Sequence, residues 1–201
     1  MSDVYLITLL AVLVLLGLNL FMLLRVSVYL HRQIDLRRRR SADTQLPVGR
    51  PAPPFRARTI GGTEIALEDL QRATALVFVS PSCGACRSEL PELGRLSSLA
   101  SSGSHTDIVL VSNEDTRTTR EWLSTIARED KVSVDLPVLI PIPDSTFLLD
   151  YNPGSSNPYF VLLDETRNVA ARSLLVEPDW LSLTRRWKAS QPLLPWAQPA
   201  G

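Results

Sequence analysis

The sequence has few residues that could bind metal ions or cross-link the chain. Among its 201 residues are two cysteines, Cys83 and Cys86, and two histidines, His31 and His105. A single cysteine pair excludes a small scaffold held together by several disulfides. A structural zinc site usually takes four cysteine or histidine ligands, and these four residues are all that the chain has. We therefore expect the two cysteines to act as a pair.

The chain also lacks a net charge, because 21 basic and 21 acidic residues cancel. The cancellation is uneven: residues 1–60 carry nine arginines against three aspartates, and residues 61–201 carry twelve basic against eighteen acidic side chains. The larger part of the chain would therefore repel phosphate groups, which excludes a general nucleic-acid-binding domain. The length fits one domain plus an appendage and leaves no room for two large domains.

One long stretch has no charged residue, the 21 residues from Val4 to Leu24. At about 1.5 Å per residue, a helix of this length matches the hydrocarbon core of a bilayer. A cleaved signal peptide would need basic residues before the stretch and a shorter apolar core. Here the basic residues follow, at Arg25, Arg32 and Arg37–Arg40. We predict a single-pass transmembrane anchor within residues 1–30.

A basic neck and a proline-rich linker, residues 31–54, follow the predicted anchor. We interpret Arg37–Arg40 as a solvated cluster at the membrane surface. Prolines 47, 51, 53 and 54 favour an extended chain. Because the arginines follow the predicted span and none precedes it, the positive-inside rule places the next domain in the cytoplasm.

Residues 55–190 alternate between apolar runs of strand length and amphipathic segments of helix length. We predict buried strands at 75–79 and 107–112, and a helix at 84–100 with leucines at three-residue intervals on one face. The other predicted elements are a hairpin over 55–66, one helical turn at 67–71, a helix at 116–129, a weak strand at 138–142, a short helix at 145–151, a hairpin of strands 159–163 and 169–175, and a helix at 177–189. This order indicates an α/β fold with a mixed central sheet flanked by helices. Residues 191–201 are expected to form an irregular tail.

The cysteine pair forms a Cys-x-x-Cys motif where a predicted buried strand ends and a predicted helix begins. At a helix N-terminus, free N–H groups and the helix dipole stabilise a thiolate at Cys83. Two intervening residues allow Cys86 to reach Cys83, so that a dithiol and a disulfide can interconvert. The motif in this position is a strong signal for redox chemistry.

Around this motif the chain resembles the membrane-anchored, thioredoxin-like redoxins of the TlpA/ResA type. Three segments carry the resemblance: VGRPAPPF at 48–55, CRSELP at 86–91 and NPYFVLLDE at 157–165. The resemblance implies a thioredoxin-like fold and thiol–disulfide oxidoreductase activity on protein cysteines. It also implies that Cys83 attacks and that Cys86 resolves the mixed disulfide.

Two further site residues are implied by the resemblance alone. Glu89, three residues after Cys86, would lie near the disulfide and tune its proton chemistry. Pro158 would follow a cis peptide bond and shape the groove that receives the backbone of a client. The implied partners are a client protein with a dithiol or disulfide, an upstream redox partner and the lipid bilayer. No metal and no organic cofactor are implied.

The whole pattern is most similar to the methylamine-utilisation accessory proteins of the MauD type, which implies a role in maturing a disulfide-containing partner. The sequence departs from thioredoxins at several positions. Ser82 replaces the usual tryptophan before the first cysteine, and Val77 replaces a buried aspartate. These departures leave the redox potential and the client open.

Two other functions are compatible with the same fold class. A peroxiredoxin would need the pattern P-x-x-x-[ST]-x-x-C, but Leu76 stands seven residues before Cys83. A metal-binding or metal-delivery module would add a distant histidine ligand, which this domain offers only as His105. The side of the membrane is also open, because the resembling family works mostly outside the cytoplasmic membrane whereas the arginines predict the cytoplasm.

Overall fold

The computed structural model describes residues 5, 7, 10, 13–25, 46–129 and 135–189. The chain divides into two compact units, Met1–Thr44 and Gln45–Gly201. In the first unit, residues 13–25 are helical, and their large apolar side chains are exposed. Much of the predicted anchor, all of residues 26–45 and the predicted tail lie outside the described residues. Among the residues that are described, no helix is both long enough and apolar enough to span a bilayer.

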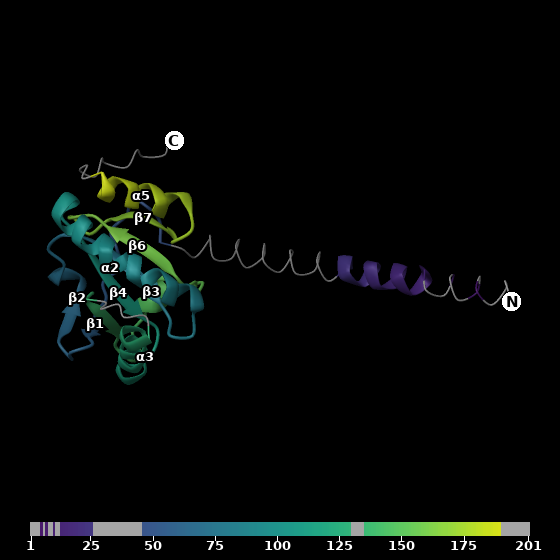
Figure 1. The fold of residues 1–201 in the computed structure, drawn as a ribbon. Helices are drawn as coiled ribbons and strands as arrows, with labels where there is room; N and C mark the ends of the chain where they lie inside the picture. The colour runs from purple at the N-terminus through teal and green to yellow at the C-terminus, as the bar shows by residue number, and fades with distance from the viewer. Residues whose placement is uncertain are drawn as a thin grey trace. The chain divides into compact units, whose positions relative to one another are not determined.

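The second unit is built on a seven-stranded mixed sheet with the strand order β2-β1-β5-β4-β3-β6-β7 (Figure 1). The strands β3, β4 and β5 are parallel to one another. The flanking strands β1, β2, β6 and β7 pair antiparallel. The strands are β1 Arg56–Thr59, β2 Glu64–Ala66, β3 Ala73–Val79, β4 Thr106–Ser112, β5 Val138–Pro141, β6 Tyr159–Leu163 and β7 Val169–Leu174. The predicted α/β fold with a mixed central sheet is therefore confirmed.

Helices cover both faces of this sheet. They are α2 Gly84–Ser104, α3 Thr116–Glu129, α4 Phe147–Tyr151 and α5 Pro178–Lys188, with a 3-10 turn at Leu67–Asp69. The central strand β3 is buried along its whole length, as expected for a strand with parallel and antiparallel neighbours and helices on both faces. Because side chains alternate across a strand, β3 sends Ala75, Val77 and Val79 to one face and Leu76 and Phe78 to the other.

The helix that carries the cysteine motif packs on the first of these faces. Its buried side chains are Cys86, Leu90, Leu93, Leu96 and Ala100, which recur at three- or four-residue intervals and form one apolar stripe. Trp180, Leu183 and Trp187 of α5 join the same core. The N-terminus of α2 is therefore held rigidly at the end of the central strand.

Helix α2 is longer than the sequence analysis predicts. The predicted helix ends at residue 100, but the Ser/Gly stretch 101–104 continues it to Ser104. Serine hydroxyls in this stretch bind carbonyl groups of the preceding turn: Ser102 Oγ donates to the Ser98 carbonyl over 2.7 Å, and Ser104 Oγ donates to the Ala100 carbonyl over 3.0 Å. The helix ends at His105, whose φ of 50° is left-handed.

The predicted linker also ends earlier than expected. Residues 46–54 belong to the folded unit, with Leu46 and Ala52 buried in the second core. Backbone hydrogen bonds join Gly49 N–H to the Val169 carbonyl and Val169 N–H to the Arg50 carbonyl, over 2.8 and 2.9 Å. The domain therefore begins at or before Leu46, not at Phe55. Proline-rich composition is misleading here because prolines are also tolerated beside a sheet edge.

Candidate active site

Cys83 occupies the N-cap position of α2, four residues after β3 ends at Val79. A turn positions it: the Cys83 N–H donates to the Ser80 carbonyl over 3.0 Å. The Cys83 sulfur accepts a hydrogen bond from the Cys86 N–H over 3.2 Å. The sulfur thus takes the place of the side-chain oxygen that commonly caps a helix, and a free helical N–H stabilises negative charge on it.

Cys86 lies one turn further into α2 and is fully buried, whereas Cys83 is only half-buried. Burial raises the pKa of the Cys86 thiol to about 12, and its hydrogen bond with Cys83 and the charge of Cys83 act in the same direction. At neutral pH Cys86 is therefore a protonated thiol behind the accessible Cys83. An accessible sulfur with a buried partner is the arrangement expected of an attacking and a resolving cysteine.

Pro158 lies directly beside the cysteines. The Asn157–Pro158 peptide bond is cis, which agrees with the geometry implied by the resemblance. The Cys83 thiol donates to the Asn157 carbonyl over 3.5 Å, and the Pro158 carbonyl accepts the N–H of Leu175 over 3.3 Å. The loop before β6 and the end of β7 thus form one wall next to Cys83.

The side chain of Asn157 fixes this wall to the central strand. Its amide nitrogen donates to the Phe78 carbonyl over 3.2 Å and to the Ser156 carbonyl over 3.0 Å. Pro158 has no N–H to donate to the sheet, so the Asn157 amide supplies a bond where the backbone ladder stops. Asn157 is not among the residues predicted for the site, although its place before the predicted cis-proline is a signal that could have found it.

A pair of serine hydroxyls lies next to the cysteine loop. Ser80 Oγ and Ser82 Oγ are 2.9 Å apart and share a hydrogen bond, and Ser80 is 3 % exposed. Ser82, which stands where thioredoxins usually have a tryptophan, therefore helps to order the turn that holds Cys83. Nothing in the residue pattern alone indicates this contact.

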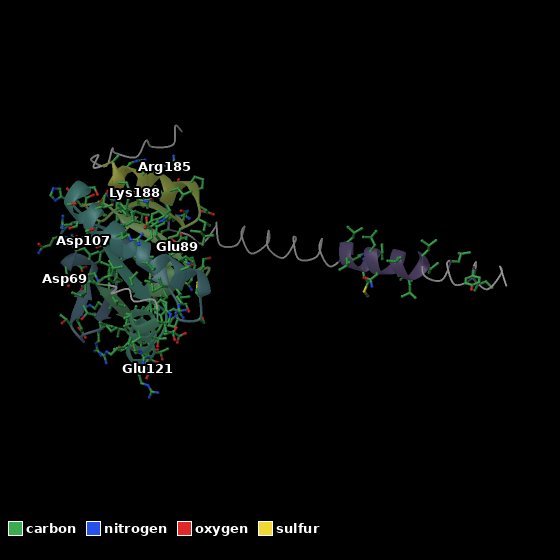
Figure 2. All side chains as sticks on the ribbon, in the orientation of Figure 1. Asp69, Glu89, Asp107, Glu121, Arg185 and Lys188 are labelled. Atoms are coloured by element: carbon green, nitrogen blue, oxygen red, sulfur yellow. The ribbon has the colours of Figure 1, made fainter. Side chains whose placement is uncertain are left out.

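Glu89 lies on α2, one turn after Cys86. It is half-buried and lines a groove of about 370 Å³ between α2 and α5, together with Val176, Trp180 and Lys188. Figure 2 shows Glu89 on α2 and Lys188 on the neighbouring α5. The Cys83 sulfur bonds to the Asn157 carbonyl and to the Cys86 N–H rather than to Glu89, and Glu89 is not among the groups that shift the pKa of Cys86. The structure thus brings together Cys83, Cys86 and Pro158, and it places Glu89 in the groove one turn further along α2.

His105 is too remote to assist the cysteines. It ends α2, the helix that Cys83 begins, and a helix of that length spans roughly 30 Å. Its Nδ1 lies 3.1 Å from a guanidinium nitrogen of Arg72. Within the described part of the chain, no group of three histidine, cysteine or acidic side chains could hold a metal ion. The geometry gives no support to a metal site that joins His105 to the cysteine pair.

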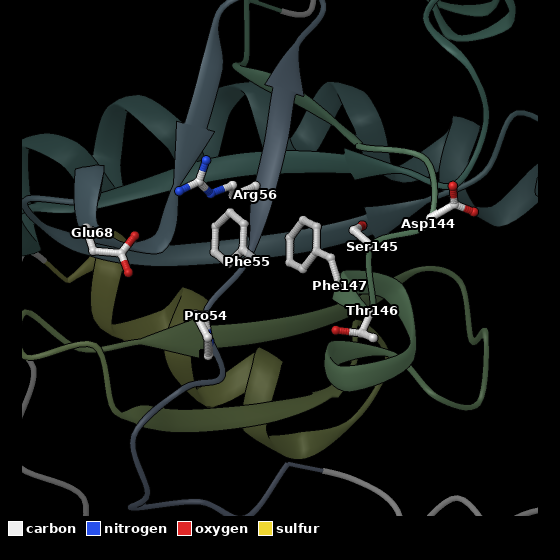
Figure 3. Close-up of a pocket in the computed structure, with 8 residues that line it drawn as sticks. All are labelled: Pro54, Phe55, Arg56, Glu68, Asp144, Ser145, Thr146 and Phe147. Carbon is white, nitrogen blue, oxygen red and sulfur yellow. The ribbon is translucent and has the colours of Figure 1, made fainter.

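A larger pocket, of about 530 Å³, lies against the opposite face of the sheet (Figure 3). Phe55 and Phe147 lie side by side in it, with ring centroids 4.1 Å apart. Neither cysteine lines this pocket. The chemistry of the domain is therefore centred on the small exposed region around Cys83 rather than on this larger pocket.

Comparisons with known proteins agree with this geometry. Residues 47–184 match the model of the Redoxin family. Among curated proteins, no sequence matches the chain.

Solved structures share the fold at low identity. A putative thiol:disulfide interchange protein DsbE from Chlorobium tepidum is 21 % identical, with a TM-score of 0.57 over 73 % of this chain and 99 % of that chain. A putative protein disulfide isomerase from Bacteroides thetaiotaomicron is 18 % identical, with a TM-score of 0.58 over 72 % and 90 % of the two chains. Yeast Sco1 with copper bound is 16 % identical, with a TM-score of 0.54 over 74 % and 98 %. At these identities the likeness shows the thioredoxin-like fold alone.

Proposed function

We propose that this chain, which belongs to the Redoxin family and is a thioredoxin-like thiol–disulfide oxidoreductase, is tethered to a membrane and acts on the cysteines of a client protein. One observation carries the choice of chemistry. The accessible Cys83 caps α2 while its partner Cys86 is buried one turn behind it. A redox-inert pair would need neither the capping N–H on one sulfur nor this difference in exposure.

The exchange proceeds in two balanced steps. The Cys83 thiolate attacks one sulfur of a client disulfide, forms a mixed disulfide and releases the other client sulfur as a thiolate. Cys86 then loses its proton and attacks the Cys83 sulfur, which releases the second client thiolate. The protein ends as a disulfide and the client as a dithiol, after transfer of two electrons. The same steps in reverse oxidise a client dithiol.

Trapping the mixed disulfide tests this function in the full chain. In Cys86→Ser, Cys83 can still attack but no thiol is left to release the client, so covalent complexes should accumulate on a non-reducing gel and disappear with reductant. Peroxide turnover by the reduced wild type, at a rate comparable to disulfide exchange, would instead favour the peroxiredoxin alternative.

The membrane tether rests on the uncharged stretch Val4–Leu24 and on the arginines that follow it. The described apolar side chains of this stretch are exposed, for example Leu15 at 68 % and Met22 at 69 %, which suits burial in lipid. Alkaline carbonate extraction of membranes tests the tether: an anchored chain stays in the pellet, and a peripheral one is released.

By its resemblance to the MauD-type proteins, we place the redox domain on the extracytoplasmic side and assign it a role in maturing a disulfide-containing partner. The arginine cluster favours the opposite orientation by the positive-inside rule. Labelling of Cys83 in intact cells with a membrane-impermeant maleimide decides between them. Labelling only after the cells are broken would place the domain in the cytoplasm.

A further inference from the structure

The groove between α2 and α5 offers an apolar surface next to the cysteine pair. Leu96, Leu175 and Trp180 line it, and Val176 and Leu181 lie at its open side. Val176 is 72 % exposed and Leu181 is 44 % exposed. Apolar side chains that remain exposed beside a buried apolar lining are typical of a surface that binds another chain.

This groove is connected to the reactive sulfur through short contacts. Leu175, at one end of the groove, donates its N–H to the Pro158 carbonyl over 3.3 Å. The residue before Pro158, Asn157, accepts the thiol of Cys83 through its carbonyl over 3.5 Å. The loop around Pro158 therefore contacts both the Cys83 sulfur and a residue that lines the groove.

Of the two glutamates that line the groove, Glu89 and Glu92, one is paired with basic residues and the other is not, among the residues that the structure describes. Glu92 is paired with Lys188 over 2.8 Å and with Arg95 over 3.6 Å. Glu89, one turn nearer to Cys83, has no cationic partner among the residues that the structure describes. A basic side chain of a bound chain would complement this charge, and the apolar surroundings would reduce its screening by water.

We propose that this groove binds the client segment that flanks the client cysteine, and that this segment carries an apolar residue and, about three positions from the cysteine, an arginine or lysine. Glu89 follows Cys83 by six residues, which is about 9 Å of helical rise. An extended chain covers that distance in about three residues. The inference rests on the proposed function and adds a recognition role for Glu89 that is separate from the proton chemistry of the sulfurs.

The chain's own C-terminal residues are a poorer occupant. Residues 190–201 contain apolar side chains but no basic one, so they would leave Glu89 unpaired. A basic client segment satisfies both the apolar surface and the carboxylate. Removal of residues 190–201 separates the two occupants experimentally.

Rates of attack on matched disulfides test the proposal. The reduced full chain is mixed with short peptides whose single cysteine forms a disulfide with thionitrobenzoate, and the release of this coloured thiol is followed. One peptide carries leucine and an arginine three residues from the cysteine, and its partner has glutamate in place of arginine. The control is the mixed disulfide of 2-mercaptoethanol with thionitrobenzoate, which is too small to reach the groove.

We expect the wild type to react about twofold to fivefold faster with the arginine peptide than with the glutamate peptide, the range for one partly screened ion pair. Glu89→Gln should abolish this preference and Glu89→Lys should reverse it. Val176→Ser should lower the rate of reaction with both peptides relative to the rate with the control disulfide. The matched variant Glu121→Gln, on α3 and away from the groove (Figure 2), should keep the wild-type preference.

Several outcomes would overturn the proposal. Equal rates for the two peptides exclude recognition by charge. A change in the 2-mercaptoethanol rate in Glu89→Gln as large as the change with the arginine peptide means that Glu89 acts on the sulfurs. A peptide preference that appears only after residues 190–201 are removed identifies the C-terminal segment as the occupant. No release from any disulfide by the wild type refutes the proposed function itself.

Discussion

The Cys86 N–H donates to the Cys83 sulfur over 3.2 Å, so the backbone of the buried cysteine stabilises the sulfur of the accessible one. The relationship is not symmetrical. Cys83 accepts this hydrogen bond and is only half-buried, whereas burial raises the pKa of the Cys86 thiol to about 12. We therefore expect Cys83 to be much more reactive than Cys86, although the two lie only three residues apart.

This difference predicts which cysteine reacts first. In the reduced chain, brief treatment with iodoacetamide at neutral pH should modify Cys83 at least about tenfold faster than Cys86, as measured by mass spectrometry of the peptides. In Cys83→Ser, the remaining thiol should stay unmodified until the protein is denatured. Equal modification of the two cysteines would show that the assigned roles are wrong.

The pair should also behave as one two-electron couple. Cys83 and Cys86 are the chain's two cysteines, and the hydrogen bond between them places both within one helical turn. Equilibration of the full chain in a series of glutathione buffers should give a single transition between two free thiols and none. Two free thiols that persist after prolonged exposure to excess oxidised glutathione would contradict the oxidoreductase function.

The buried thiol should make the reduced form less stable at high pH. Unfolded, Cys86 ionises near pH 9.0, whereas in the folded chain its pKa is about 12. Its contribution to stability is therefore complete below pH 9 and is lost as the pH rises toward 12, with a loss on the order of 1 kcal/mol at pH 10. Urea unfolding of the reduced chain at pH 7.5 and pH 10 measures this loss.

Cys86→Ala is the matched control for the pH experiment. It keeps Tyr151, whose pKa burial also raises, and every other titrating group except the buried thiol. The reduced wild type should lose more stability between the two pH values than this variant does. Parallel losses in both proteins would mean that Cys86 titrates normally.

The order of the elements follows from the sequence because each depends on local patterning. The apolar run of β3 and the leucine stripe of α2 are enough to place the Cys-x-x-Cys motif between a strand and a helix. The predicted C-terminus of α2, at residue 100, is wrong because the Ser/Gly stretch 101–104 lacks the apolar pattern of the helix before it. Here the Ser102 and Ser104 hydroxyls donate hydrogen bonds to carbonyl groups of the same helix, which the pattern of apolar residues does not show.

The wall opposite Cys83 is harder to predict, because it depends on contacts between distant parts of the chain. Asn157 meets Cys83 across 74 residues of sequence, and its amide reaches Phe78 on the central strand. A resemblance can indicate Pro158. The hydrogen bonds of Asn157 join residues far apart in sequence, and they form only because β3 packs against β6. Glu89 shows the same limit, since its helix position leaves open whether it faces the sulfurs or α5.

A last prediction concerns the start of the domain, where Phe55 directly follows the segment 31–54 that the sequence assigns to the linker. Phe55 is 4 % exposed and stacks on Phe147 (Figure 3). The ring centroid of Tyr151 is 5.6 Å from that of Phe55, in an edge-on contact. Phe55→Ala should lower the free energy of unfolding by about 3 to 5 kcal/mol. Tyr151→Phe, which removes the 2.6 Å hydrogen bond to the Pro53 carbonyl, should cost about 1 kcal/mol.

Leu149→Ala on the same helix α4 is the control, because its side chain is 69 % exposed and its loss should change the unfolding free energy by no more than about 0.5 kcal/mol. If Phe55 were only loosely attached to the domain, Phe55→Ala would resemble Leu149→Ala in urea unfolding. A large cost for Phe55→Ala, with the rate of disulfide exchange unchanged in the folded protein, would show that Phe55 is part of the domain's core. Because Phe55 and Cys86 pack on opposite faces of the sheet, such a loss of stability should leave the chemistry of the cysteines intact.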